Sequence, residues 1–505
     1  MSNTMPSSQI RSKFLPFAVH WRGWIAGVIG LGCAVVLIHY WLTQGDYGSA
    51  AAHGDAPVLP PLWGIGITPF AIILAAIAFL PLLPTTLHWW EDNVNRLLVS
   101  LFCAVVTIAY VALTMGYDAV GPLLEHAIID EYGPFIALLF ALYVISGGIR
   151  LSGDLPATPW VNATFLAVGT LLASFIGTTG ASMLLIRPLL QTNQERTHVL
   201  HTVIFFIFLV SNIGGTLLPI GDPPLFLGYL RGVPFDWTLR LLPEWTAATS
   251  ILLLAYYLLD RRMYRREPRG ALIRDVMERK PLRFQGMINF LWLGCVVLAV
   301  AFLVPGRTIS LAGASITVFP YLREIAMLIL VILSLVTTPQ RIRDGNQFSY
   351  HAILEVAALF IGIFVAMQIP LAVLRATGAD ITQNLNEPWQ FFWATGSLSA
   401  FLDNAPTYAV FFELARTLEP AAGAAVVELN TTPPTTIPAS LLIAISLGSV
   451  FMGAMTYIGN GPNFMVKSIA ERAGVKMPSF FGFMIRYSIP ILVPVFILVM
   501  VLFLL

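Results

Sequence analysis

Two stretches of this chain, Ile220–Pro224 and Ile458–Pro462, interrupt long apolar segments with helix-breaking residues. They read Ile-Gly-Asp-Pro-Pro and Ile-Gly-Asn-Gly-Pro, one in each half of the chain. Lipid cannot hydrogen-bond a free backbone group, so non-helical backbone at membrane depth occurs only inside protein or beside a cavity. Paired breaks in corresponding positions of two halves are typical of the binding site of a secondary transporter.

Composition places these breaks in a membrane protein. Of the 505 residues, 57% are hydrophobic and 11% are charged, whereas soluble domains carry about a quarter charged residues. We therefore predict an all-α polytopic fold whose main partner is the lipid bilayer. The net charge of +1 indicates no nucleic-acid partner. The three cysteines lie in separate apolar runs and predict neither a disulfide framework nor a cofactor site, and His198 with His201 lacks further metal ligands.

Two further segments resemble the tips of helical hairpins that enter and leave the membrane on one side. The first hairpin is predicted over 159–190 with its tip at Gly177–Ala181, and the second over 391–418 with its tip at Asp403–Pro406. Each hairpin is followed by a broken helix, over 199–230 and 440–470. We therefore predict two repeats, 64–260 and 286–505, joined by a linker at 261–285. Residues 1–63 are predicted to form an extra helix and an external loop. The apolar run of 24–42 is longer than that of a signal peptide, which favours a retained helix, whereas Ala50-Ala51-Ala52 leaves cleavage as the alternative.

The distribution of basic residues predicts the orientation. The stretch 261–283 carries nine Lys or Arg, whereas 43–63 and 116–132 carry none. A cytoplasmic N-terminus puts the basic linker in the cytoplasm, in a multi-pass protein of the cell inner (plasma) membrane. The two hairpins then open from opposite sides, which makes the two halves inverted repeats.

Asp222 and Asp403 are the carboxylates at these breaks and tips. An ionisable group inside a membrane predicts a functional site, although Asp222 has a structural alternative as the N-cap of the helix that follows it. Carboxylate and amide oxygens suit a hard cation, so Asp403 and Asn404 are the predicted sodium ligands. A buried carboxylate can also take a proton in competition with sodium.

Other polar residues and glycines surround the same tips and breaks. For each hydroxyl or amide, the alternative is that it satisfies only the backbone groups that the breaks set free. The predicted ion- or substrate-binding set is Thr178, Thr179, Ser182, Asn212, Thr216, Gly221, Asp222, Asp403, Asn404, Thr456, Gly459, Asn460 and Asn463. Glu355 is a candidate proton relay, with snorkelling to the interface as the alternative. Arg187 and Glu413, in the return arms of the hairpins, are predicted to have structural roles.

Three strings carry a resemblance to a known group of proteins: Ser211–Pro224, Phe401–Pro406 and Glu355–Gly362. They resemble the ion transporter superfamily, in the branch of NhaD-type sodium/proton antiporters, arsenite permeases and citrate-transporter-like permeases. The resemblance implies a homodimer with a scaffold domain and an elevator-type transport domain, and ion binding at Asp403 and Asn404. The first tip departs from the antiporter pattern, because it carries Gly177-Thr178 in place of an Asp-Asn pair.

The leading functional prediction is sodium/proton antiport by alternating access, with sodium and protons as coupling ions and no other cofactor. The alternative is sodium- or proton-coupled symport of an organic anion such as citrate. No Lys or Arg adjoins a tip or a break, which favours a cation. An intramembrane aspartyl protease is disfavoured because Pro219 replaces the first glycine of the Gly-x-Gly-Asp motif, so no enzyme activity is predicted. A channel shares the composition, but paired tips favour an occluded site.

Overall fold

The computed structural model describes residues 59–277, 279–311, 314–420, 423–431 and 433–505. The predicted helix at 24–42 lies outside these residues. The described chain is mostly helical, as predicted, and six of its helical stretches are long and apolar enough to cross a membrane. The bent pair α17 (His351–Ala366) and α18 (Gln368–Ile381) is a seventh candidate if it counts as one span.

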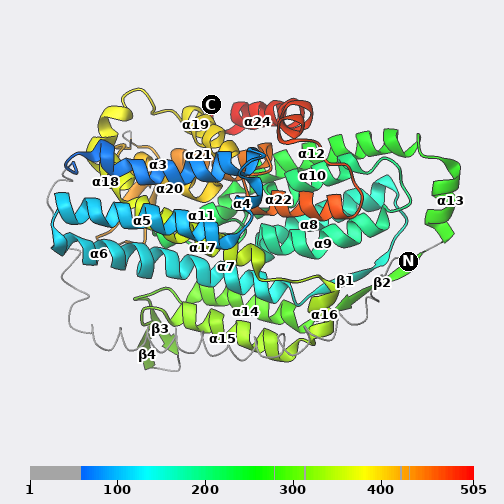
Figure 1. Ribbon diagram of the computed structural model, residues 1–505, viewed down its shortest axis with the longest axis horizontal. Helices are drawn as coiled ribbons and strands as arrows, with labels where there is room; N and C mark the ends of the chain where they lie inside the picture. Colours follow the sequence, from blue (N-terminus) through cyan, green and yellow to red (C-terminus); the bar gives the residue numbers. More distant parts are fainter. Residues whose placement is uncertain (1–58, 278, 312–313, 421–422, 432) are drawn as a thin grey trace, which may run out of the picture.

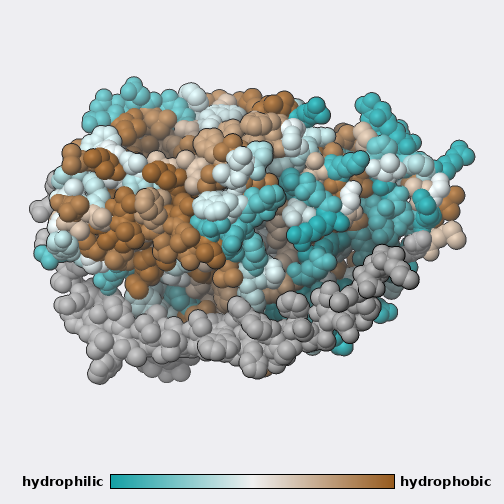
Figure 2. Space-filling model, viewed as in Figure 1, coloured by the Kyte–Doolittle hydropathy of each residue, from teal (hydrophilic) through white to brown (hydrophobic). Residues whose placement is uncertain are grey.

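The first part of the described chain holds three of the long apolar stretches, Trp63–Leu82, Asn93–Thr114 and Tyr117–Ser146, and the third continues through a π-helical segment. Its elements are α3 (Trp63–Phe79), η1 (Leu80–Leu82), α4 (Leu87–Trp90), α5 (Asn93–Thr114), η2 (Tyr117–Ala119), α6 (Val120–Leu124), η3 (Glu125–Tyr132) and α7 (Gly133–Ser146). Leu98, Phe102 and Val105 of α5 are exposed, and Figure 2 shows apolar side chains gathered over this part of the surface. Such a face suits contact with lipid acyl chains.

The segment with the first tip and break begins with α8 (Pro159–Ile176), which Thr158 caps by accepting a hydrogen bond from Val161 N. Gly177 ends α8 with φ of 77°, a conformation that favours glycine, and so turns the chain directly into the next helix. The elements that follow are α9 (Thr178–Thr192), α10 (Leu200–Leu209), η4 (Ile213–Thr216), α11 (Pro223–Leu230), η5 (Trp237–Leu241) and α12 (Leu242–Tyr264).

The second tip and break have the same order of elements. A capping box of Glu387 and Gln390 starts α19 (Pro388–Phe401), and α20 (Asn404–Arg416) returns after Asp403. The remaining elements of this part are α21 (Ala439–Met452), η6 (Gly453–Met455), α22 (Gly461–Arg472), α23 (Phe480–Phe483), η7 (Met484–Ser488) and α24 (Ile489–Phe503). Between the two parts lie α13 (Arg269–Met277), α14 (Ile288–Phe302), α15 (Leu322–Thr337), α16 (Gln340–Gly345), α17 and α18.

Three two-stranded antiparallel ribbons depart from the predicted all-α fold. They pair β1 (Arg150–Asp154) with β2 (Lys280–Gln285), β3 (Thr308–Leu311) with β4 (Ala314–Thr317), and β5 (Val426–Leu429) with β6 (Thr435–Pro438). All six strands lie in connections between apolar helices, where an apolar-run analysis has no signal. The first ribbon joins the end of α7 to the basic linker.

The broken helices meet near the middle of the molecule. In Figure 1, α8, α9, α10 and α22 lie toward the end that holds β1, β2 and α13, whereas α11, α19, α20 and α21 lie toward the other end. Each group combines both halves of the chain, because α11 contacts α20 and α9 contacts α22, and α21 contacts η4 across the two groups. Hydrogen bonds of Thr178, Asn404 and Asn460 to Asp222 bring the starts of α9, α11, α20 and α22 into one central region.

Candidate functional site

Asp222 is the centre of this region. Its carboxylate is 1% exposed and accepts three hydrogen bonds from three other segments. Thr178 Oγ1 donates to Oδ1 at 2.9 Å, Asn460 Nδ2 donates to Oδ1 at 2.9 Å, and Asn404 Nδ2 donates to Oδ2 at 2.6 Å. The first tip, the second tip and the second break thus all contact the carboxylate of the first break. All three donors are neutral.

The two carboxylates singled out in the sequence have different local roles. Asp222 precedes α11 but makes no capping hydrogen bond with it, which excludes the capping alternative. Asp403 does cap its helix, because its Oδ1 accepts from Ala405 N at 3.0 Å. Asp403 is half-buried and acts on Asp222 electrostatically, without a hydrogen bond between them.

Two buried amide oxygens at the site, Asn212 Oδ1 and Asn404 Oδ1, have no hydrogen-bond partner in the part of the chain that the structure describes. The amide nitrogen of Asn212 donates to Ile207 O and to Asn463 Oδ1, both at 2.7 Å. A Cβ added to Gly453 would lie 3.1 Å from Asn212 Oδ1 and 3.7 Å from Asn404 Nδ2, so Gly453 lies beside both amides. Buried acceptors without donors are costly and suit a hydrogen-bond donor or a cation.

The other predicted site residues support the two breaks. Asn463 Nδ2 donates to Gly453 O and Thr456 O, and Thr456 Oγ1 donates to Ala400 O while accepting from Gly459 N. Gly221 O accepts from Thr178 N at 2.9 Å, which joins the first break to the first tip. These contacts satisfy backbone groups, as the alternative interpretation of the polar residues predicts.

Three further predicted residues, Thr216, Ser182 and Thr179, also make no hydrogen bond to Asp222. Thr216 Oγ1 donates to Ile213 O in its own turn, and Ser182 Oγ hydrogen-bonds Ser211 Oγ at 2.8 Å. Thr179 follows Thr178 on α9 and is half-buried, without a hydrogen bond to the carboxylate. Their predicted part in binding stays a prediction.

Two serines that were not predicted join, through hydrogen bonds, the helix before a tip to the segment that leads into a break. Ser174 Oγ donates to Gly214 O and accepts from Leu217 N. Ser399 Oγ donates to Ser449 O at 2.7 Å. Both serines lie in the last turn before a tip, so a search for small polar residues in that turn would have found them.

Glu355 lies apart from Asp222 and pairs with Arg96 Nη2 at 3.0 Å, which joins α17 to α5. Its predicted relay of protons stays a prediction. Glu413 forms the ion pairs expected of a structural role, with Arg375 at 2.8 Å and Arg416 at 3.5 Å. Arg231, which follows α11, also pairs with Glu131 at 2.8 Å.

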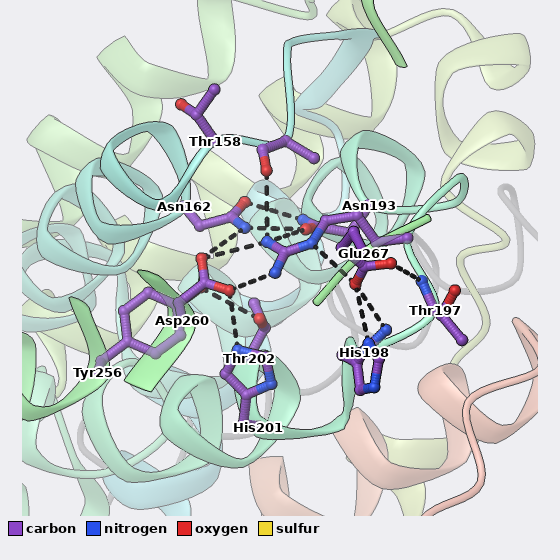
Figure 3. Close-up of polar contacts among 12 residues, drawn as sticks. Thr158, Asn162, Asn193, Thr197, His198, His201, Thr202, Tyr256, Asp260 and Glu267 are labelled. Atoms are coloured by element: carbon purple, nitrogen blue, oxygen red, sulfur yellow. Dashed lines mark hydrogen bonds and ion pairs between the residues drawn. The ribbon is translucent and has the colours of Figure 1, made fainter. Parts of the chain in front are cut away.

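A second group of buried polar residues comes from α8, α10 and α12 and from the segments that follow α9 and α12 (Figure 3). Arg196 Nη2 contacts Asp260 Oδ1 at 2.5 Å, and Arg196 Nε lies 3.6 Å from Glu267 Oε1. His201 Nε2 also contacts Asp260 Oδ1, at 2.9 Å. We name Asn162, Asn193, Arg196, His198, His201, Tyr256, Asp260 and Glu267 the Asp260 network. Its carboxylates are paired with cationic or titratable side chains, unlike Asp222.

Comparison with known proteins identifies the family. Residues 60–504 match the profile of the protein family described as "Putative citrate transport". The chain belongs to this family. Uncharacterized transporters of Mycobacterium bovis and Mycobacterium tuberculosis are each 24% identical to it over 426 residues, which cover 78% of this chain and 90% of each relative.

Membership places the chain in the citrate-transporter-like branch to which the sequence showed a resemblance. The protein is a multi-pass membrane transporter, and its partners are the lipid bilayer and a small substrate.

Proposed function

We propose that the protein exchanges sodium for protons, and that Asp222 is the carboxylate for which the two ions compete. The observation that carries this proposal is that Asp222 is buried among neutral donors only. A buried carboxylate without a cationic partner is costly. A sodium ion or a proton bound at Asp222 would remove this cost, and exchange of one for the other couples their movements.

The surrounding oxygens support sodium as one of the two ions. Sodium favours carboxylate, amide, hydroxyl and carbonyl oxygens, as other hard cations do. Asn212 Oδ1 and Asn404 Oδ1 are buried acceptors without donors, and the Thr178 hydroxyl oxygen retains acceptor capacity. Asp403 adds a second negative charge nearby.

Alternating access follows from the two tips. We propose that the halves are inverted repeats, so that the tip of α8 and α9 faces the cytoplasm and the tip of α19 and α20 faces outside. Each tip contributes one donor to Asp222, from Thr178 and from Asn404. Breaking one of these contacts would open the site to one side only. A homodimer, an elevator-type movement, a cytoplasmic N-terminus and the cell inner membrane belong to the same proposal.

Symport of a carboxylate anion with sodium or protons is the second candidate. Four helices start at the site, and the positive ends of helix dipoles favour an anion. The family description also names citrate. In this case the cation at Asp222 would offset the charge of the anion.

A pH-dye assay on proteoliposomes distinguishes the two candidates. Antiport predicts that pulses of sodium or lithium, without any organic anion, move protons out of vesicles that contain the protein, whereas potassium does not. Proton-coupled symport predicts no response until citrate is added. Proton movement that is identical in vesicles without the protein, for every pulse, would contradict both antiport and proton-coupled symport.

A further inference from the structure

Arg187 differs from the other arginines whose guanidinium nitrogens are buried. Among the described residues, the other arginines with a buried guanidinium nitrogen that lacks a partner are Arg96, Arg196, Arg231 and Arg343, and each makes hydrogen bonds through another of its nitrogens. Arg187 Nη1 is buried without a partner, and no ion pair or hydrogen bond of its side chain is found among the described residues. Arg187 as a whole is half-buried, but a buried guanidinium nitrogen without a partner is costly, and a charged group of this kind in a membrane protein indicates a functional site.

The surroundings of Arg187 are positive. The groups that act on it electrostatically are Tyr143 of α7 and a second cation, Arg472 at the end of α22. Arg472 is exposed, and α22 packs against α9. Tyr143 keeps its hydroxyl bonded to Ser349 O at 2.8 Å and so offers no negative charge. Arg472 therefore adds positive charge from the helix packed against α9, and an anion bound at Arg187 would be stabilised by both charges.

The position of Arg187 separates it from Asp222. Arg187 lies about 13 Å along α9 from Thr178, at 1.5 Å per helical residue. Its helix, α9, packs against β1 and lies toward the end of the molecule that holds β1 and β2 (Figure 1). An anion at Arg187 would therefore be bound beside the same helix that contacts the ion site, at its linker end.

We propose that Arg187 and Arg472 form an oxyanion-binding site that is distinct from the Asp222 site. The ligand is a carboxylate or a phosphate, because the planar guanidinium of arginine binds both through two parallel hydrogen bonds. A free organic or inorganic oxyanion would bind from the aqueous side, and the phosphate of an anionic lipid would bind from the bilayer. The site does not depend on whether the transporter is an antiporter or a symporter.

Calorimetric titration of the purified full-length protein tests this site. In sodium-free buffer, Tris citrate and Tris phosphate are titrated into protein in detergent, and phosphatidylglycerol is compared with phosphatidylcholine in nanodiscs. We expect saturable binding of at least one oxyanion that Arg187→Gln weakens by about tenfold or more, the loss typical of a charged hydrogen bond. Arg472→Gln should weaken it less, and Arg261→Gln, an exposed arginine of the same end, should leave it unchanged.

Two comparisons keep the result specific. Asp222→Asn should leave anion affinity unchanged; an equal loss in Asp222→Asn and Arg187→Gln would put the anion at the central site and overturn the proposal. Binding of phosphatidylglycerol alone, lost in Arg187→Gln, would identify the lipid phosphate as the source. Wild-type affinity of Arg187→Gln for every probe, or no binding of any probe, would overturn the proposal.

A measurement on the wild-type protein covers the case in which Arg187→Gln does not fold. Phenylglyoxal modifies arginine side chains, and mass spectrometry of the peptides gives the rate for each arginine. Bound citrate, phosphate or phosphatidylglycerol should slow the modification of Arg187 by about tenfold while that of Arg261 stays the same. An unchanged rate at Arg187 with all three probes would contradict the proposal.

Discussion

Asp222 and Asp260 are both buried carboxylates, and their partners differ in one respect. Asp222 accepts hydrogen bonds from a hydroxyl and two amides, all neutral. Asp260 contacts the guanidinium of Arg196 and the ring of His201 (Figure 3). A carboxylate with a permanent cationic partner needs no other ion, whereas a carboxylate with neutral partners is stabilised by a mobile one. The difference separates a structural carboxylate from a candidate transport carboxylate.

Removing the charge of Asp222 gives the largest expected effect. Asp222→Asn should lower coupled transport to below about 1% of the wild-type rate, because several kcal/mol of cation binding depend on this charge. The variant should still fold, since asparagine has nearly the same volume. Transport is measured in proteoliposomes at equal amounts of folded protein. A transport rate within about tenfold of wild type would show that transport does not depend on the charge of Asp222, and the proposed difference between Asp222 and Asp260 would not hold.

The same change at Asp260 should act on stability. Asp260→Asn leaves Arg196 buried with its main partner neutral, which costs about 3–5 kcal/mol for a buried pair that loses one member. Thermal unfolding of the purified protein should therefore shift strongly downward, while the rate per folded molecule stays close to wild type. An unchanged unfolding temperature together with lost transport would assign Asp260 to the transport site and contradict our interpretation.

Asp403 tests whether a carboxylate near Asp222 has a structural role, because its side chain caps α20. Asp403→Ala should cost about 1 kcal/mol of stability through the lost cap, whereas Asp403→Asn should keep the cap, since asparagine caps helices about as well. We expect Asp403→Asn to retain transport within about tenfold. If Asp403→Asn instead loses transport as completely as Asp222→Asn, both carboxylates bind the ion.

Glu267 gives the smallest effect, as a pH dependence of stability. Burial alone would raise the pKa of Glu267, but hydrogen bonds from Thr197 N and His198 N and the charge of Arg196 hold this pKa below its ordinary value. Its contribution to stability is therefore complete above the unfolded pKa of about 4.3 and is lost as pH falls through the lower folded value.

Glu267→Gln removes this dependence. Unfolding temperatures between pH 7 and pH 3 should start lower in the variant than in wild type and fall less steeply below about pH 5. Parallel curves for the two proteins would show that Glu267 does not contribute in this way. Asp222 should show no comparable link to the stability of the Asp260 network.

The sequence predicted the breaks and tips because glycine and proline act locally. Gly177 and Asp403 do stand where one helix ends and the next begins. The roles of the two carboxylates could not be predicted, because the sequence analysis had no information on which distant groups meet. Asp222 is bonded by Asn404 and Asn460, which lie in the other half of the chain.

The same reason explains what the sequence analysis missed outside the site. Arg196 and Asp260 are 64 positions apart in the sequence, so their pairing has no local pattern. A structural role was predicted for Arg187 from its place in a return arm, whereas the structure shows that its buried Nη1 has no partner among the described residues. The ribbons β1–β2, β3–β4 and β5–β6 are too short for a periodic signal.

Sodium binding to the purified protein tests the central claim about Asp222 most directly. Equilibrium binding of radioactive sodium is measured together with proton release in weakly buffered solution, for wild type, Asp222→Asn and Asp403→Asn. We predict saturable sodium binding with proton release in wild type and in Asp403→Asn, and neither in Asp222→Asn. Sodium binding and proton release by Asp222→Asn equal to those of wild type would contradict the claim that Asp222 is the carboxylate shared by the two ions.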